Sequence, residues 1–371
     1  MTDLHEAGPD ELDGWDARTV DVAGGHVYQS RTWGEYRRRH GWRVRFLVYD
    51  DGSGVLVAER PWPVIGGSGA YIARGPVSAG EPAERTANRL RAAADWLAGH
   101  GVDVVSSDAE IAASTGYPAM LERRGFRPIE EVQPSRHRVS LPLDPAADAE
   151  SVFGAFTKSL RQTIRTAEHR GVRIVRYDAR PSANPGLDGL FEEPPLDAGS
   201  PAALAPVFAR FHDAIAKTAV RRHFPVPPRS QLVDASSHAV AAGLAFHLET
   251  YGTDGELVSA SLFYRHGRRI SYGLSADRVD RRQAYPGVVQ LALWRAIQVA
   301  IAEGCDEFDL AGVDVLGARD RPAPGDEMHG LLAMKERFGG RWVELSGNHE
   351  WVARPWRYGV GRVVARLRRL T

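Results

Sequence analysis

The residues best suited to chemistry lie in segment 330–340, which begins as an apolar helix and ends in a pair of glycines. Lys335 lies on this helix and is one of only three lysines among 47 basic residues. An ammonium held beside apolar side chains can bind an anion or stabilise an oxyanion. The alternative is a surface lysine whose stem covers the core while its charge stays in water.

Polar side chains also stand at the ends of strand-like runs, where α/β folds present their ligands. Asp108 follows one such run, Asp309 lies within another, and Tyr272 precedes the glycine that ends a third. A buried carboxylate needs a partner. For Asp108 a functional and a structural role are equally open, whereas for Asp309 the structural role of closing a loop is the favoured hypothesis.

Other classes of site lack their motifs. The 13 histidines form no pair with metal-ligand spacing, and the single cysteine, Cys305, excludes a disulfide framework and a thiolate-rich zinc site. The sequence has no Walker A motif, no G-x-G-x-x-G and no G-x-S-x-G. We therefore expect no metal site, and no nucleotide held by either glycine-rich loop.

Strands and helices alternate along the chain, which predicts an α/β fold. In the first half we expect strands at 44–49, 54–58 and 70–73, a helix at 82–97 and a strand at 102–106. In the second half we expect strands at 257–264 and 269–273, a helix at 287–303 and a strand at 307–310. The repeated order indicates an internal duplication, although any α/β protein repeats such units.

The segment between the halves is amphipathic. Residues 151–170 predict one helix with an apolar stripe, and Lys158, Arg161 and Arg165 lie on its polar side. The following stretch, 180–206, is rich in Pro, Ala and Gly, which predicts a surface loop that adds nothing to a core.

The net charge is zero, with 47 basic and 47 acidic residues, but the charges are unevenly placed. The last eighteen residues carry six arginines and no acid, and segment 360–370 is amphipathic. This segment either docks on its own protein, which is the favoured interpretation, or touches an anionic membrane. The acidic N-terminus resembles no secretory signal and no apolar run is long enough to span a bilayer, so we expect a cytoplasmic protein.

Six groups of residues, taken together, resemble the Fem family of aminoacyl-tRNA-dependent peptidyltransferases, which build the peptidoglycan cross-bridge. Their order and spacing over most of the chain carry the resemblance. The groups are 28–30 with Trp33 and 41–42, then 71–77, 160–167 with 171–172, 272–273, 308–312 and 335–340.

The resemblance implies mixed α/β sheets in two tandem GNAT-like domains without a coiled-coil arm. The first domain would span residues 1–145 and the second 146–344, with the tail from about 345 to 371 packed back on the first. We expect a monomer, because no exposed apolar stripe demands a partner.

The implied reaction moves an amino acid from aminoacyl-tRNA to an amine of a peptidoglycan precursor peptide, without a cofactor. The acceptor would be a UDP-linked or lipid-linked muropeptide, the latter at the inner face of the membrane. By similarity, the catalytic residues are Lys335, near the tRNA acceptor end or the oxyanion, and Asp108, near the acceptor amine.

The same similarity suggests binding residues. Arg37 and Arg221 match basic positions that hold the precursor's phosphates, Tyr272 lines the site, and Met334 replaces the phenylalanine that usually precedes the lysine. The basic face formed by Lys158, Arg161 and Arg165 is a weaker candidate for tRNA contact.

Departures from the family pattern keep alternatives open. Ala109 replaces the usual proline after Asp108, and Pro225 stands where an aromatic residue would line the pocket. The alternatives are aminoacyl transfer to a small peptide natural product, an acyl-CoA-dependent GNAT acetyltransferase, and a silent protein that binds tRNA or muropeptide. The acetyltransferase is disfavoured because the turn 282–287 contains one glycine and a proline without an N–H, a poor cradle for pyrophosphate.

Overall fold

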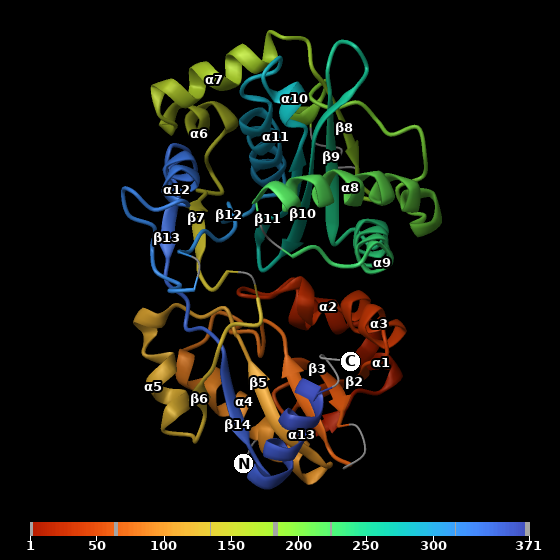
Figure 1. Ribbon diagram of the computed structural model, residues 1–371, viewed down its shortest axis with the longest axis vertical. Helices are drawn as coiled ribbons and strands as arrows, with labels where there is room; N and C mark the ends of the chain where they lie inside the picture. Colours follow the sequence, from red (N-terminus) through yellow and green to blue (C-terminus); the bar gives the residue numbers. More distant parts are fainter. Residues whose placement is uncertain are drawn as a thin grey trace. The chain divides into compact units, whose positions relative to one another are not determined.

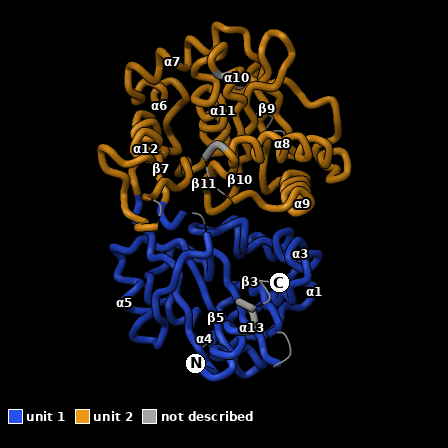
Figure 2. Tube along the Cα trace, in the orientation of Figure 1, with its two compact units in different colours: residues 1–137, 343–371 blue, residues 138–342 orange. Residues whose placement is uncertain are grey.

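The computed structural model describes residues 3–62, 66–133, 135–180, 185–222, 225–315 and 317–367. The chain forms two compact units, coloured separately in Figure 2. Unit 1 comprises residues 1–137 and 343–371, and unit 2 comprises residues 138–342. Each unit contains a seven-stranded mixed sheet covered by helices, which confirms the predicted α/β class (Figure 1).

The sheet of unit 1 has the strand order β1-β2-β3-β4-β5-β14-β6. Its strands are β1 (Leu4–Glu6), β2 (Arg43–Tyr49), β3 (Gly54–Pro61), β4 (Ser68–Ile72), β5 (Val102–Ser107), β6 (Arg127–Pro128) and β14 (His349–Val352). Its helices are α1 (Pro9–Asp13), α2 (Trp15–Thr19), α3 (Arg31–Arg39), α4 (Ala83–Gly99), α5 (Tyr117–Glu122) and α13 (Pro355–Leu367).

Helix α4 joins the parallel strands β4 and β5 of unit 1. Leu90, Ala94 and Leu97 are fully buried on its inner face, and Gly101, at a φ of 92°, turns the chain into β5. The last residue pair between these strands joins Ile72 to Ser107. Asp108 therefore lies where two parallel strands end, at the carboxyl edge of the sheet.

The sheet of unit 2 has the order β13-β7-β12-β11-β10-β9-β8. Its strands are β7 (Arg138–Pro142), β8 (Arg173–Tyr177), β9 (Ala245–Tyr251), β10 (Leu257–His266), β11 (Arg269–Asp277), β12 (Glu307–Asp309) and β13 (Arg341–Val343). Its helices are α6 (Ala149–Ala155), α7 (Lys158–Glu168), α8 (Pro201–Arg222), α9 (Arg229–Ala241), α10 (Val279–Arg282), α11 (Val288–Ala302) and α12 (His329–Glu336).

The two faces of this second sheet bury separate cores. Phe246 and Phe263 face the cluster that contains α7 and α11, whereas Ala245 and Leu262 face the cluster that contains α8 and α9. Figure 1 shows α8 lying across the strands of this sheet, with α9 next to it. In the described part of the chain, no coiled-coil arm leaves either sheet.

Both units repeat one arrangement. A hairpin (β3–β4 or β10–β11) leads through a crossover helix to a parallel strand (β5 or β12). The crossover strand also pairs on its other side with an antiparallel strand from a distant part of the sequence, β14 on β5 and β7 on β12. The duplication indicated by the sequence is thus present in three dimensions.

Two local predictions were wrong. Segment 151–170 forms two helices, because Thr157 turns the chain and caps α7 by accepting a hydrogen bond from the N–H of Leu160 at 3.4 Å. Residues 180–206 do contribute to a core, because Leu187 is only 7% exposed and packs in the cluster around α11. Among the described residues, no helix is both long enough and apolar enough to cross a bilayer.

Candidate active site

Asp108 is the centre of a buried polar cluster in unit 1. It is 2% exposed and accepts hydrogen bonds from the hydroxyl of Tyr71 at 2.8 Å and from the backbone N–H of Arg74 at 2.7 Å. The Arg74 guanidinium lies 3.6 Å from the same carboxylate. Two oxygens, each with a second lone pair, can still accept a hydrogen bond from a ligand amine.

The electrostatics of this cluster follow from its burial. Burial raises the pKa of Asp108, although Arg74 opposes the shift. Burial also favours the neutral form of Arg74, but Asp108 and Glu110 outweigh it and raise the pKa of the guanidinium. Arg74 is therefore a permanent cation beside a carboxylate that binds protons more readily than an exposed aspartate.

Arg37 belongs to the same region of unit 1. Its guanidinium lies over the rings of Trp33, at 4.7 Å, and Trp42, at 5.0 Å. The ring of Tyr28 stacks on that of Trp33 at a centroid distance of 4.3 Å. The charges of Arg37 and Asp108 both act on the pKa of the Tyr28 hydroxyl, in opposite directions. Burial lowers the pKa of Arg37. The structure thus brings the two predicted residues of unit 1 into one aromatic and charged cluster.

Several members of this cluster were not singled out by sequence reasoning. Tyr71 and Arg74 lie in the family-like segment 71–77, so a signal for them existed. Glu110, 3.9 Å from Arg74 and 3.8 Å from His26, lies outside every motif. The sequence offered no signal for that pair.

Lys335 is the corresponding buried charge in unit 2. It lies in the last turn of α12 and is 3% exposed, so the alternative of a surface lysine was wrong. Its ammonium donates hydrogen bonds to the carbonyl oxygens of Ala311, at 3.0 Å, and Gly312, at 3.1 Å. Among the described residues these bonds use two of its three N–H groups, which leaves one for a ligand.

Opposing effects set the pKa of the Lys335 ammonium. Burial lowers its pKa to about 8, against the raising effect of Asp309 and Asp314. An ammonium with this pKa is still mostly charged near neutral pH and lies in a low-dielectric site, where it stabilises a developing negative charge well.

Asp309 shapes the loop that Lys335 contacts. Its carboxylate accepts hydrogen bonds from the N–H of Ala311, at 2.8 Å, and from the hydroxyl of Ser271, at 3.3 Å. Ala311 adopts a φ of 66°, which a residue with a side chain rarely does, and which turns its carbonyl toward Lys335. The loop-closing role expected of Asp309 is confirmed.

The second of the two glycines that follow Lys335 is required by packing. A Cβ on Gly340 would lie 2.7 Å from Val139 and 2.9 Å from the carbonyl oxygen of Lys335.

We expect Gly340→Ala to lower the free energy of unfolding by about 1–3 kcal/mol through overpacking. Gly330→Ala, in the same segment, meets no atom within 4 Å and should raise it by roughly 0.5–1 kcal/mol. Urea unfolding measures both, and equal effects would contradict this account.

The other predicted residues of unit 2 are placed as follows. Tyr272 lies on β11, one residue beyond the last pair with β12, and its ring stacks on Phe263 at 5.5 Å. Burial raises the pKa of Tyr272. Met334 is half-buried and packs on the core of unit 2. Arg221 lies near the end of α8, and its side chain is outside the described part of the structure.

The basic face of α7 differs from the expected row of exposed cations. Lys158 is exposed at the first residue of the helix. Arg161 instead donates to the carbonyls of Gly154 and Phe156, and so holds the corner between α6 and α7. Arg165 is exposed, with its guanidinium 5.5 Å from the ring of Phe153.

The start of α11, where a GNAT acetyltransferase would hold pyrophosphate, is covered. A Cβ on Gly287 would lie 2.7 Å from the carbonyl oxygen of Thr163 on α7. The turn is further closed by Arg170, which donates to the carbonyl of Ala284 at 2.7 Å. The N–H groups of Ala284 and Tyr285 both donate to the carbonyl of Arg281. These amides are therefore already used within the chain.

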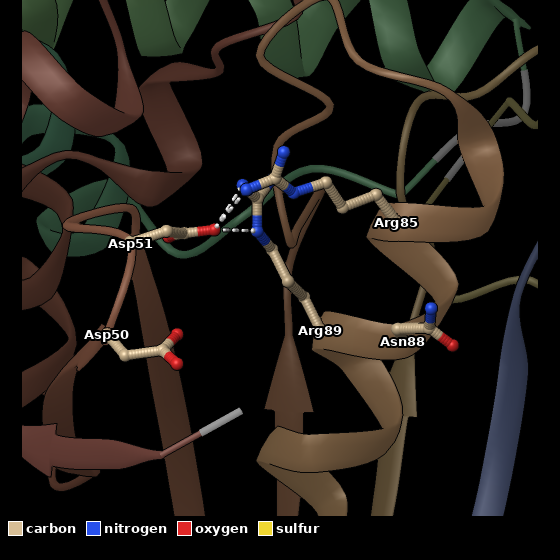
Figure 3. Close-up of a pocket in the computed structure, with 5 residues that line it drawn as sticks. All are labelled: Asp50, Asp51, Arg85, Asn88 and Arg89. Atoms are coloured by element: carbon tan, nitrogen blue, oxygen red, sulfur yellow. Dashed lines mark hydrogen bonds and ion pairs between the residues drawn. The ribbon is translucent and has the colours of Figure 1, made fainter. Parts of the chain in front are cut away.

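Two other features bear on ligands. A pocket of about 360 Å³ in unit 1 is lined by Asp50, Asp51, Arg85, Asn88 and Arg89 (Figure 3). Its arginines pair with Asp51, at 2.7 Å from Arg89 and 3.3 Å from Arg85, so its charges largely neutralise one another. Within the described residues, no group of three or more His, Cys, Asp or Glu side chains could hold a metal ion.

Comparison with known proteins decides the type of fold. A model of the acetyltransferase (GNAT) domain matches residues 154–327. The crystal structure of FemX is similar over 96% of this chain and 99% of that one, with a TM-score of 0.72 at 16% identity. The chain has two tandem GNAT-like domains. The resemblance to the Fem family is thereby confirmed as a likeness of fold.

Two further solved structures share the tandem GNAT-like fold. A conserved protein of unknown function from Bacteroides thetaiotaomicron matches with a TM-score of 0.52 at 11% identity, over 94% of this chain and 99% of that one. L-PGS from Bacillus licheniformis matches with a TM-score of 0.50 at 13% identity, over 98% and 97%. A search of curated proteins gives no significant match. These likenesses concern the fold alone, and the reaction and its substrate must be argued from the site.

Proposed function

We propose that this tandem GNAT-fold protein transfers an amino acid from aminoacyl-tRNA to an amine of a peptidoglycan precursor peptide. The observation that carries the proposal is the buried ammonium of Lys335, held by the carbonyls of Ala311 and Gly312. A buried cation with an N–H to spare is suited to the oxyanion of acyl transfer. The FemX-like fold supports the same reaction class.

The chemistry needs little beyond positioning and electrostatics, because the tRNA ester is already activated. The acceptor amine attacks the ester carbonyl, the C–N bond forms, and the carbonyl oxygen becomes an oxyanion that Lys335 stabilises. The C–O bond to the tRNA ribose then breaks, and the ribose oxygen takes up a proton as the amine loses one. By the family resemblance, Asp108, whose pKa burial raises, is assigned the role of orienting the amine and accepting its proton.

The acceptor's phosphates are assigned to the basic residues. The guanidinium of Arg37 lies among aromatic rings. The guanidinium is suited to bind a phosphate, and the rings are suited to pack on the face of a base or a sugar. Arg221 is the second candidate on the strength of the family resemblance. Because charged tRNA is the donor, the reaction belongs in the cytoplasm, at the inner membrane face for a lipid-linked acceptor.

The acyl-CoA-dependent alternative is weaker for a structural reason. Pyrophosphate needs free backbone N–H groups at the start of the crossover helix. In unit 2 that position is covered by α7, and the turn contains Pro286. A silent protein that binds tRNA or muropeptide remains the second alternative, and transfer to a small peptide natural product the third.

A transfer assay followed by mass spectrometry tests the proposal. Purified protein is mixed with a pool of aminoacylated tRNAs and with either UDP-linked or lipid-linked muropeptide. We expect the muropeptide to gain the mass of one amino acid residue, which identifies donor and acceptor together. Parallel reactions with acetyl-CoA or deacylated tRNA are the controls. Folded protein that transfers nothing to either acceptor, or that transfers acetyl groups, would refute the proposal.

A further inference from the structure

Helix α13 is anchored to unit 1 by one of its faces. Arg354, just before the helix, donates to the carbonyls of Ala98 at 3.0 Å and Val102 at 3.1 Å. Tyr358 donates to the carboxylate of Glu350 at 2.7 Å. These contacts hold the start of α13 against unit 1.

The same face continues one turn further. Gly361 is buried, and a Cβ there would lie 2.7 Å from the ring of Trp62. Positions 354, 358 and 361 thus form one stripe with spacing i, i+4, i+7, and the glycine lets the helix approach unit 1 closely.

The opposite face of α13 carries a second stripe with the same spacing, and it is apolar. Trp356 is 66% exposed, Val360 43% and Val363 58%. They are three of the seven large apolar side chains exposed in the described part of the chain. A single exposed apolar residue is ordinary, but a row of three along one helix marks an interaction surface.

The charged side chains that α13 itself carries are all positive, although Arg357 also has the carboxylate of Asp103 at 4.0 Å. Arg357 lies 5.1 Å from the ring of Trp356, and Arg362 lies one residue before Val363. The sequence after Glu350 contains no acidic residue and adds Arg366, Arg368 and Arg369. A nucleic acid would use the arginines but would leave the apolar stripe in water. A surface with both anionic groups and hydrocarbon matches the whole pattern.

We propose that α13 is an interfacial helix that binds the surface of an anionic lipid bilayer. Trp356, Val360 and Val363 insert at the boundary between headgroups and acyl chains, while the arginines contact lipid phosphates. This binding needs neither tRNA nor a muropeptide, so it is independent of the proposed transfer reaction. It brings unit 1 to the surface on which a lipid-linked acceptor would lie.

Co-sedimentation of the full chain with vesicles tests the proposal. We expect binding to vesicles of phosphatidylcholine with about 30% phosphatidylglycerol, little binding to pure phosphatidylcholine, and weakening at high salt. The double variant Trp356→Ser with Val363→Ser should bind anionic vesicles at least about tenfold more weakly, because it removes most of the inserted surface. Both positions are exposed, so its thermal unfolding should match that of wild type.

Val132→Ser is the matched control, since Val132 is 57% exposed and follows two acidic residues. It should bind vesicles as wild type does.

Arg362→Gln should weaken binding to anionic vesicles and leave any binding to neutral ones unchanged. If the double variant binds anionic vesicles as tightly as wild type, α13 is not an interfacial helix. If tRNA binding is lost in the double variant while vesicle binding persists, the helix serves nucleic acid and the proposal is overturned.

Discussion

Lys335→Met is expected to slow aminoacyl transfer by about 100- to 1,000-fold, the effect of removing one preorganised donor to an oxyanion. The methionine fills a similar volume but offers no N–H, so the carbonyls of Ala311 and Gly312 also lose their partner. Single-turnover transfer with saturating charged tRNA measures the chemical step. Lys217→Ala, which changes an exposed lysine of the same unit, is the matched control and should transfer at the wild-type rate.

A fall in transfer caused by unfolding must be excluded. The free energy of unfolding of Lys335→Met, measured in urea, identifies conditions in which the variant is fully folded. If the folded variant transfers as fast as wild type, Lys335 has no part in the chemistry. If it loses only affinity for tRNA, the lysine binds the acceptor end of the tRNA and does not stabilise the oxyanion.

The pH dependence gives an independent readout of Lys335. The folded-state pKa of about 8 lies below the ordinary value of 10.5, so between these values the unfolded chain binds more protons than the folded one. The free energy of unfolding of wild type should therefore rise with pH across this window, relative to Lys335→Met. The transfer rate should fall as pH rises through about 8, because the donor loses its charge. Urea unfolding and single-turnover rates at pH 7 and pH 10 measure both trends.

Asp108→Asn is expected to reduce transfer by about 100-fold or more, since a positioned general base contributes that much. The amide keeps the shape of the carboxylate and can still accept from Tyr71 or from the N–H of Arg74, but it carries no charge. Asp108→Ala should in addition lower the free energy of unfolding by about 3 kcal/mol, because it breaks a buried ion pair and leaves the guanidinium of Arg74 with the more distant carboxylate of Glu110 and the carbonyl of Ser135.

The matched control for Asp108 is another buried aspartate, on β5, the strand that Asp108 follows. Asp103 is fully buried, accepts from the indole of Trp62 at 2.9 Å and pairs with Arg354 at 3.3 Å. Asp103→Asn should lower stability but leave the transfer rate of the folded protein unchanged with a UDP-linked acceptor. Equal loss of transfer in both variants would mean that Asp108 acts only through the fold.

The sequence predicted best the elements whose partners are local. Helices expected at 82–97 and 287–303 are found as Ala83–Gly99 and Val288–Ala302. Their periodicity is set by side chains three and four residues apart, and Gly101 and Gly304, at φ of 92° and 66°, mark their ends. The same local logic failed at 151–170, because the apolar spacing continues across Thr157 while the backbone turns there.

The sequence alone therefore determined the α/β class, the repeated hairpin–helix–strand unit, and Lys335 and Asp108 as candidates. Only the tertiary structure decided that β14 pairs with β5 and β7 with β12, because such strand partners lie far apart in the chain. It also decided the surroundings of each candidate residue. Lys335 is buried, and Asp108 is paired with Arg74. Periodicity is set by near neighbours in sequence, whereas the burial and pairing of a charge depend on which distant segments fold around it.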